Sequence, residues 1–486
     1  MLDILIAIVP KINPDAPTVG PALLKTHIQD AGFTCEVIDL NIKLFNAAKA
    51  KNKEHLWKYD DHFFSTDHSD PYLSKDFNKF YKEFKDVFNE WINIIREKNP
   101  KYLGLSLLSI YSQSVAIKIG QLVKKNLPHI KIVWGGPQIE HGVDTFKDLG
   151  YLDHYISGDA EISIVEFLKD NLTYKGIDSL EVNQLLDLNS MKFPNYDDMI
   201  WDEYYDPSNH RPTYITGSRG CVKRCTFCNV YKIWPEFRFR SGENIAKEII
   251  YIKERYDRSI FKFTDSLING SMKAFRNLCL VLSEYRKINT DIKLGWISQW
   301  IIRSKHQSPE SDYIAMKESG CIMLEIGLES FSQDVRWHMG KKFTDEDMWW
   351  CLDMLNKQEI PHVLLMIVGY PTETEEDHQH TLQCVKKIFN LGWDKYTNFS
   401  FGNTLMLTTP QPLYKLVKDE LEYFNSNIDW KYRDNDLETR VRRFKEVNDL
   451  VKNLSKIKRI PQMTDKALKN YEKKLQGKLP NDRWDG

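Results

Sequence analysis

The sequence has no excess of charge of either sign. Its 486 residues include 67 lysines and arginines against 68 aspartates and glutamates, so no overall field favours nucleic acid or a membrane surface as a partner. Long hydrophobic runs are also missing. The opening stretch MLDILIAIVPKINP has an apolar run of only about seven residues with no basic segment before it, which indicates a buried strand rather than a signal peptide. Since no later run is long enough to span a bilayer, we expect a cytoplasmic protein.

Cysteine is scarce as well. Eight cysteines in a chain of 486 residues are too few for a disulfide scaffold. Three of them stand together in the segment GSRGCVKRCTFC, residues 217–228. The other five are scattered through apolar segments, where free cysteines are usually buried as small hydrophobic side chains. These five are Cys35, Cys279, Cys321, Cys351 and Cys384.

What the first part of the chain does contain is an alternation of strand and helix patterns. Apolar β-type runs alternate with helical patterns, including helices near residues 20–32 and 112–127. This order predicts an α/β domain over residues 1–171 with a doubly wound parallel sheet of the Rossmann-like kind. Residues 41–98 are charged and aromatic without strand alternation and predict a helical insertion. Residues 172–210 predict a polar connector.

A second alternating series runs from residue 211 to about 410. Its strands read TYITG, IFKFTD, IKLGWIS, MLEIGL, HVLLMIVG and YTNFSF, each followed by a helical pattern. Six such units predict a partial (β/α)6 barrel of the triosephosphate isomerase type. Residues 411–486 are highly charged and show no obvious strand, so we expect a helical C-terminal region. No internal repeat has a solenoid period.

The spacing of the three clustered cysteines limits their chemistry. A structural zinc site closes with four ligands, and the nearest histidine, His210, lies upstream on a different segment. Three thiolates spaced C-x3-C-x2-C on one loop can hold three irons of a 4Fe-4S cluster and leave the fourth iron open. The loop follows the first barrel strand, at the rim where such folds place their chemistry. This favours the cluster over zinc or unligated thiols, which remain the alternatives.

Cys221, Cys225 and Cys228, with Phe227 just before the third cysteine, resemble the cluster motif of radical S-adenosylmethionine (radical SAM) enzymes. In that family the open iron binds the amino and carboxylate groups of S-adenosylmethionine. The resemblance implies that these three cysteines are the metal ligands and that Phe227 lies at the cofactor.

The resemblance extends over residues 212–415 through the stretches RFRSGENI, FTDSL, GLES and VGYPTETEED, each expected at the carboxyl end of a strand. Asp265 also fits a helix N-cap, because a helical pattern follows it, and Glu329 and Ser330 also fit the start of a helix. The roles implied by the resemblance are cofactor binding for Arg240, Ser241, Glu329 and Ser330, a catalytic position for Asp265, and shaping of the rim for Gly369 and Pro371.

The first domain is similar to the cobalamin-binding domain that precedes the barrel in one large radical SAM subclass. Its strand-end stretches PKINPDAPTVG, SLLS, GGP and GDAE fall where doubly wound sheets bind ligands. The resemblance implies cobalamin contacts at Ser106, Leu108, Gly135 and Gly136. The loop after the first strand has no Asp-x-His-x-x-Gly motif, so no lower histidine ligand for cobalt is expected, and His141 is not assigned to cobalt. A domain that has lost cobalamin is the alternative.

Together the two resemblances imply an enzyme that reductively cleaves S-adenosylmethionine to a 5'-deoxyadenosyl radical and uses cobalamin to methylate an unactivated carbon. A radical rearrangement, cyclisation or oxidation without net methylation is the second reading, and a non-catalytic iron-sulfur or cobalamin sensor the third. No basic stripe with interleaved aromatics crosses the barrel, so a nucleic-acid substrate is not expected. A small molecule, lipid precursor or peptide is expected as substrate, with flavodoxin or ferredoxin as electron donor.

Overall fold

The computed structural model describes residues 2–58, 73–139, 150–179, 181–205, 212–401, 405–409 and 411–455. The chain forms two compact units, Met1–Ile215 with Tyr251–Ile260, and Thr216–Ile250 with Phe261–Gly486. The domain limits drawn from the sequence stay predictions. His141, His210 and parts of the expected insertion, connector and tail lie outside the described residues. No helix in the described part of the chain is both long and apolar enough to cross a membrane.

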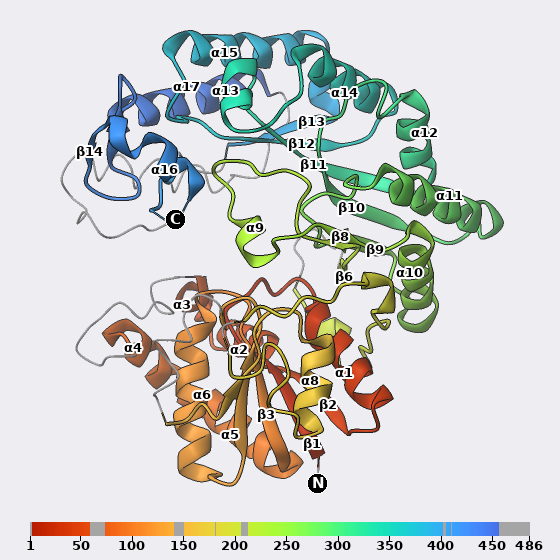
Figure 1. The fold of residues 1–486 in the computed structure, drawn as a ribbon, viewed down its shortest axis with the longest axis vertical. Helices are drawn as coiled ribbons and strands as arrows, with labels where there is room; N and C mark the ends of the chain where they lie inside the picture. Colours follow the sequence, from red (N-terminus) through yellow and green to blue (C-terminus); the bar gives the residue numbers. More distant parts are fainter. Residues whose placement is uncertain are drawn as a thin grey trace. The chain divides into compact units, whose positions relative to one another are not determined.

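The first unit is the predicted α/β domain. Its five-stranded sheet has the order β2-β1-β3-β4-β5, and all the strands pair in parallel. Figure 1 shows the strands between α5 and α6 on one side and α1 and α8 on the other. The strands are β1 (Leu2–Ile8), β2 (Cys35–Asp39), β3 (Pro100–Ser106), β4 (Lys131–Gly135) and β5 (His154–Tyr155), and the flanking helices are α1 (Val19–Asp30), α6 (Ser112–Asn126) and α8 (Ala160–Leu168).

The described parts of the segment 41–98, residues 41–58 and 73–98, are mainly helical, as the sequence predicts, but they are not an excursion from the sheet. Aromatic side chains from these parts pack with strand residues in one buried cluster that includes Phe45, Trp91, Leu103 and Trp134. The aromatic content is therefore the core-facing side of the crossover between β2 and β3. The helices are α2 (Leu40–Ala50), α3 (Glu54–Lys58), α4 (Lys75–Glu83) and α5 (Lys85–Lys98).

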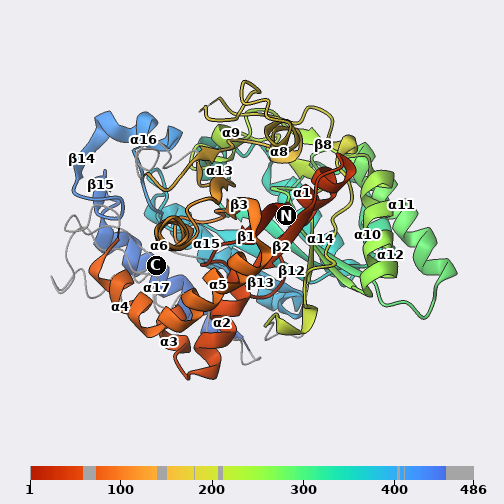
Figure 2. The ribbon, with the colours of Figure 1, turned by 90° about the horizontal axis from the view of Figure 1, so that it is seen from below.

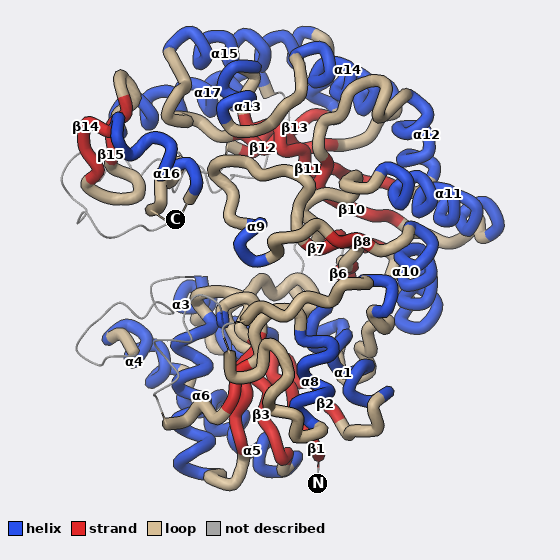
Figure 3. The backbone as a smooth tube through the Cα atoms, in the orientation of Figure 1, coloured by secondary structure: helices blue, strands red, loops and turns tan. Residues whose placement is uncertain are grey.

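The second series of strands forms the predicted partial barrel. The strand order is β13-β12-β11-β10-β9-β6, so strands neighbouring in sequence neighbour in space, and the pairs from β10 to β13 are parallel. Figure 3 shows these strands in red with helices outside them, and Figures 1 and 2 both show α10, α11 and α12 side by side. The strands are β6 (Thr213–Ile215), β9 (Ile260–Phe263), β10 (Gly295–Trp300), β11 (Cys321–Glu329), β12 (His362–Met366) and β13 (Thr397–Ser400).

Helices follow the strands before β13, and a short hairpin brackets the cysteine segment. The hairpin strands β7 (Ser218–Arg219) and β8 (Arg238–Phe239) pair antiparallel, with α9 (Val230–Ile233) between them. The barrel helices are α10 (Gly242–Tyr256), α11 (Met272–Ile288), α12 (Glu310–Glu318), α13 (Gln333–His338), α14 (Asp345–Lys357) and α15 (Glu375–Asn390).

The C-terminal region is mainly helical, with α16 (Pro412–Val417) and α17 (Leu437–Leu454). The expectation that it lacks strands is wrong: β14 (Leu421–Phe424) and β15 (Trp430–Tyr432) form an antiparallel hairpin. The sequence LEYFNSNIDWKY does contain the signal, since two aromatic-rich runs flank a turn of Asn, Ser and Asp. The surrounding charged residues obscure it.

Candidate functional site

The loop that holds the three cysteines begins with two closely packed glycines, and the second of them, Gly220, has a backbone that requires glycine. A Cβ on Gly220, whose φ is +83°, would lie 2.5 Å from the carbonyl oxygen of Glu236 on the other side of the hairpin. A Cβ on Gly217 would lie 3.0 Å from Ile245 and 3.1 Å from a carboxylate oxygen of Asp265. The glycines of GSRGC therefore allow the loop to turn closely against the strand that follows it.

Cys225 is buried, and Cys221 and Cys228 are half-buried. Burial raises the pKa of the Cys225 thiol to about 11, the neighbouring thiols of Cys221 and Cys228 add to the rise, and the ammonium of Lys341 opposes it. The three sulfurs are thus close enough to interact electrostatically. Among the described residues they nevertheless do not form a set with every sulfur within 4.8 Å of the others.

That spacing bears on the zinc alternative. Four ligands in a tetrahedron around one zinc, with Zn–S bonds near 2.3 Å, place thiolate sulfurs about 3.8 Å apart. At least one pair of these sulfurs is farther apart than a single zinc ion requires. The loop suits a larger group held by three separate thiolates better than it suits one zinc ion.

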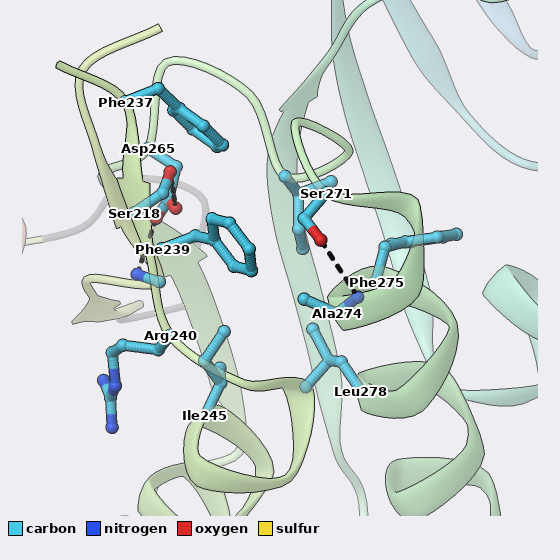
Figure 4. Close-up of a pocket in the computed structure, with 12 residues that line it drawn as sticks. Ser218, Phe237, Phe239, Arg240, Ile245, Asp265, Ser271, Ala274, Phe275 and Leu278 are labelled. Carbon is cyan, nitrogen blue, oxygen red and sulfur yellow. Dashed lines mark hydrogen bonds between the residues drawn. The ribbon is translucent and has the colours of Figure 1, made fainter. Parts of the chain in front are cut away.

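Asp265 follows β9 and reaches back to the start of the cysteine loop. Its buried carboxylate accepts hydrogen bonds from the Gly217 amide (2.8 Å) and the Ser218 hydroxyl (2.5 Å), as Figure 4 shows. Burial raises the pKa of Asp265 to about 7, although these two hydrogen bonds and the charge of Arg240 oppose the rise. The alternative that Asp265 caps the next helix is wrong, because Ser271 caps α11 by accepting from the Ala274 amide.

A pocket lies beside Asp265, between the hairpin and the start of α11. The rings of Phe237 and Phe239 stack with their centroids 5.7 Å apart and face Ser271 and Phe275 across it (Figure 4). Its lining is mostly apolar, with Ser218, Asp265 and Ser271 supplying polar groups.

Arg240 and Ser241 link the hairpin to α10. The Arg240 guanidinium is fully buried and bonds Glu248 (2.5 Å), the side chain of Asn244 (2.7 Å) and the carbonyl of Thr216 (2.9 Å), and it points away from the pocket (Figure 4). The Ser241 hydroxyl accepts from the Asn244 amide in the first turn of α10. Both residues fix the chain just after the cysteine loop, and cofactor contact for them stays a prediction.

Glu329 ends β11 in an unusual backbone conformation. Its φ is +67°, which is in the left-handed region and costs roughly 1–2 kcal/mol for a side chain of this kind. Its carboxylate pairs with Lys341 at 2.9 Å, and Lys341 also donates to the Gly327 carbonyl at 2.6 Å. Backbone strain held in place by a buried ion pair is typical of functional positions.

The alternative that Glu329 and Ser330 serve only to start the next helix is wrong, because another residue is the N-cap of α13. Ser332 caps α13 by accepting from the Val335 amide, and Ser330 accepts from the Ser332 amide just before it. Ser330 therefore supports the helix start without capping it, and Glu329 takes no part in it.

Lys341 does not stand out in the sequence, where it is one of two lysines in GKKF. The structure places its ammonium 6.0 Å from the centre of the Phe227 ring and close enough to Cys221 and Cys225 to affect both thiols. Only the fold of the segment after α13 reveals this buried cation beside the cysteines.

The predicted contacts in the first unit lie at the carboxyl ends of its strands. Ser106, at the end of β3, is the register partner of both Ile8 on β1 and Gly135 on β4. A Cβ on Gly135 would meet no atom within 4 Å, whereas a Cβ on Gly136 would lie 2.5 Å from the Leu107 carbonyl oxygen.

The strand ends thus form one edge, with Leu108 half-buried in the loop after β3. Strand order changes direction between β1 and β3, and doubly wound sheets bind ligands at such a point. The structure therefore brings together the positions that the sequence predicts.

A second group of potential metal ligands lies between α15 and α17. One ligand atom each from Glu375, His378 and Glu446 lies within 4.8 Å of the others. Arg442 already pairs with Glu375 at 2.6 Å and with Glu446 at 3.0 Å. These groups form an ion-pair network that joins the two helices, so the cysteine loop is the better candidate centre.

Comparison with known proteins identifies the family of the second unit. Residues 215–385 match the radical SAM superfamily. An uncharacterised methyltransferase of Pyrococcus horikoshii is 21% identical over 372 residues, which cover 70% of this chain and 78% of that protein. An anaerobic magnesium-protoporphyrin IX monomethyl ester cyclase of Rubrivivax gelatinosus is 24% identical over 240 residues, or 48% of this chain and 40% of the cyclase.

Two solved structures share the fold of most of the chain. The radical S-adenosylmethionine methyltransferase TsrM from Kitasatospora setae, solved with cobalamin and a [4Fe-4S] cluster, has a TM-score of 0.59 at 15% identity and covers 86% of this chain and 75% of its own. The cobalamin-dependent S-adenosylmethionine radical enzyme OxsB, solved with aqua-cobalamin and S-adenosylmethionine, has a TM-score of 0.65 at 14% identity and covers 98% and 71%. Residues 215–385 are a radical SAM domain.

Proposed function

We propose that the protein is a cobalamin-dependent radical SAM methyltransferase that acts on an unactivated carbon of a small molecule, lipid precursor or peptide. The observation that supports this most is the presence in one chain of a three-thiol barrel loop and a doubly wound unit with small residues along its ligand-binding edge. Neither part alone suggests methylation.

The residues of the barrel rim suit a 4Fe-4S cluster and S-adenosylmethionine. Cys221, Cys225 and Cys228 offer three thiols, with at least one pair of sulfurs farther apart than a single zinc ion requires. Glu329 and Lys341 offer a carboxylate and an ammonium at the end of β11, and these charges complement the amino and carboxylate groups of an amino acid such as the methionine part of the cofactor.

The edge of the first unit suits cobalamin. The open space at Gly135 and the tight turn at Gly136 leave the backbone accessible to a large flat ligand. In the described residues of the loops after β1, β3 and β4 there is no histidine. Cobalamin bound at this edge would therefore lack a lower imidazole ligand from those loops.

When bound, the three groups supply reductive cleavage of S-adenosylmethionine and a transferable methyl group, and the protein supplies binding and positioning. The three thiols hold the cluster. Asp265 fixes the entry to the cysteine loop through Gly217 and Ser218, and Arg240, paired with Glu248, fixes its exit. An electron donor such as flavodoxin or ferredoxin would reduce the cluster.

A second candidate is a cobalamin-associated cyclisation, rearrangement or oxidation without net methylation. The similarity to a magnesium-protoporphyrin ester cyclase and to OxsB, which is described as a radical enzyme, supports it. A third candidate is a non-catalytic iron-sulfur or cobalamin sensor. This function does not account for the Glu329–Lys341 ion pair or for the hydrogen bonds of Asp265.

The product ratio separates these candidates. Methylation through cobalamin consumes two S-adenosylmethionine molecules, so turnover should release 5'-deoxyadenosine and S-adenosylhomocysteine in comparable amounts. Anaerobic reactions with cell-extract substrate pools and methyl-deuterated S-adenosylmethionine would be analysed by liquid chromatography and mass spectrometry. A product three mass units heavier is expected. Substrate-dependent 5'-deoxyadenosine without S-adenosylhomocysteine or labelled product would favour the second candidate.

The cluster assignment has its own control. Changing Cys221, Cys225 or Cys228 to Ala should abolish both the iron-sulfur absorption of the reconstituted protein and cleavage of S-adenosylmethionine. Cys279→Ala, at a fully buried cysteine of α11, should preserve both. Retention of the brown chromophore by the triple variant would refute the assignment, and failure to bind hydroxocobalamin with an intact cluster would indicate a first unit that has lost cobalamin.

A further inference from the structure

The residue directly after the second cysteine is held by three separate segments of the second unit. The Thr226 amide donates to the Met339 carbonyl at 3.0 Å, after α13, and its carbonyl accepts from the Leu413 amide at 2.8 Å, in α16. Its hydroxyl lies 2.8 Å from the Tyr370 phenol oxygen, in the loop after β12. Because Thr226 is the direct neighbour of Cys225, each of these bonds constrains the position of a thiol.

Tyr370 is the side-chain member of this set. Its ring is fully buried, and its phenol oxygen also lies 2.9 Å from Nδ1 of His338. Burial lowers the pKa of His338, so the ring is neutral and can accept or donate one bond at Nδ1. The phenol therefore bridges the cysteine loop to α13 inside a closed hydrophobic cluster.

The C-terminal region in turn holds Tyr370 in place. The Asn435 side chain donates to the Tyr370 carbonyl at 2.7 Å. Arg440 is fully buried, donates to the carbonyls of Ile428, Trp430 and Asn435, and lies 3.6 Å above the Trp430 ring.

The backbone next to Tyr370 is shaped to fit this arginine. Gly369 has a φ of +80°, and a Cβ there would lie 2.4 Å from Cγ of Arg440. An unbroken series of contacts thus runs from α17 and the β14–β15 hairpin through Tyr370 to the loop between Cys225 and Cys228.

We propose that Tyr370 is a positioning residue for the iron-sulfur cluster: its phenol fixes the Cys225–Cys228 loop, and the C-terminal region sets the cluster geometry through it. This inference rests on the proposed cluster at the three cysteines. It assigns a role to residues 411–454, for which the sequence suggests none. Only two residues separate Cys225 from Cys228, so a shift of Thr226 cannot occur without moving at least one thiolate.

Tyr370→Phe removes the hydroxyl and keeps the ring. A buried hydrogen bond of ordinary strength corresponds to roughly a five-fold change in an equilibrium or rate, so we expect a chelator to strip iron from the anaerobic holoprotein about five times faster. Thr226→Val should have an effect of similar size. Because both variants remove the same bond, the double variant should be little faster than either single variant.

A spectroscopic readout separates positioning from loss of stability. The electron paramagnetic resonance spectrum of the reduced cluster should change in Tyr370→Phe and in Thr226→Val. Tyr432→Phe is the matched control: Tyr432 lies in the same buried cluster, and its hydroxyl bonds Glu420 instead of the cysteine loop. It should leave the spectrum and the chelation rate unchanged.

The possible results are distinct. Three results would each overturn the positioning role and leave the cluster assignment intact. Tyr370→Phe could show the wild-type spectrum and the wild-type rate of iron release, or Tyr432→Phe could change both as much as Tyr370→Phe does. The third result is a rate of iron release in the double variant that equals the product of the two single effects. Wild-type protein that never takes up a cluster would instead overturn the proposed function, and this inference with it.

Discussion

Asp265→Asn tests how the buried carboxylate supports the cysteine loop. The carboxylate accepts from the Gly217 amide and the Ser218 hydroxyl, and both bonds are formed in a site that is 4% exposed. An asparagine keeps the size and the polarity but has no titratable proton. The difference between the two proteins therefore isolates the protonation of this one group.

The size of the effect follows from the pKa. Burial raises the pKa of Asp265 from 3.8 to about 7. Between these values the folded protein binds a proton that the unfolded chain has released, so the contribution of Asp265 to stability is full below pH 4 and is lost as the pH rises to 7. At 1.36 kcal/mol per pH unit, the whole window corresponds to about 4 kcal/mol, and the interval from pH 5 to pH 8 to about 3 kcal/mol.

Urea unfolding of wild type and Asp265→Asn at pH 5 and pH 8 measures this difference. We expect the free energy of unfolding of wild type to fall by about 3 kcal/mol relative to that of the variant between pH 5 and pH 8. The effects of the other titrating groups cancel in this comparison because both proteins share them. Asp419→Asn, at a side chain 89% exposed, should differ from wild type by less than about 0.5 kcal/mol at both pH values. If the free energies of unfolding of wild type and Asp265→Asn differ by the same amount at pH 5 and at pH 8, the reasoning is refuted.

Two further substitutions test the packing around the site. Arg240→Ala should destabilise the protein by about 3–5 kcal/mol in urea unfolding, because it leaves Glu248 buried without its counter-charge. Replacing both Arg240 and Glu248 by apolar residues should destabilise the protein less. A double variant that is destabilised as much as Arg240→Ala, or more, would contradict this. Gly369→Ala should cost about 1–3 kcal/mol more than Gly392→Ala. Both glycines have positive φ, but only a Cβ at Gly369 would meet Arg440, whereas Gly392 faces open space. Equal melting temperatures for the two alanine variants would exclude the predicted clash.

Local patterns in the sequence are enough to predict the elements of both sheets. The six barrel strands expected from apolar runs all form, and in the predicted order, because buried parallel strands need continuous apolar residues and successive βα units place them side by side. The spacing of Cys221, Cys225 and Cys228 likewise limits the chemistry of the loop without reference to the rest of the fold, since three thiols within eight residues can be brought together by one loop.

The hairpin near the C-terminus is an element that local patterns miss. Strands β14 and β15 have four and three residues, too short for alternation to stand out in a charged segment. The aromatic segment 41–98 resembles an insertion for a different reason. Its helices are predicted, but their aromatic faces become interpretable only when the sheet that they cover is known.

The sequence by itself determined which residue types stand at the strand ends, because each βα boundary is a local feature. Only the tertiary structure decided which of them meet. Tyr370 and Thr226 lie 144 residues apart, and Asp265 and Gly217 lie 48 apart. Lys341 reaches Glu329 from the far end of a short helix. The carboxyl ends of parallel strands converge on one edge, but the partner that each buried polar group finds there depends on the packing of loops and helices, which no local pattern encodes.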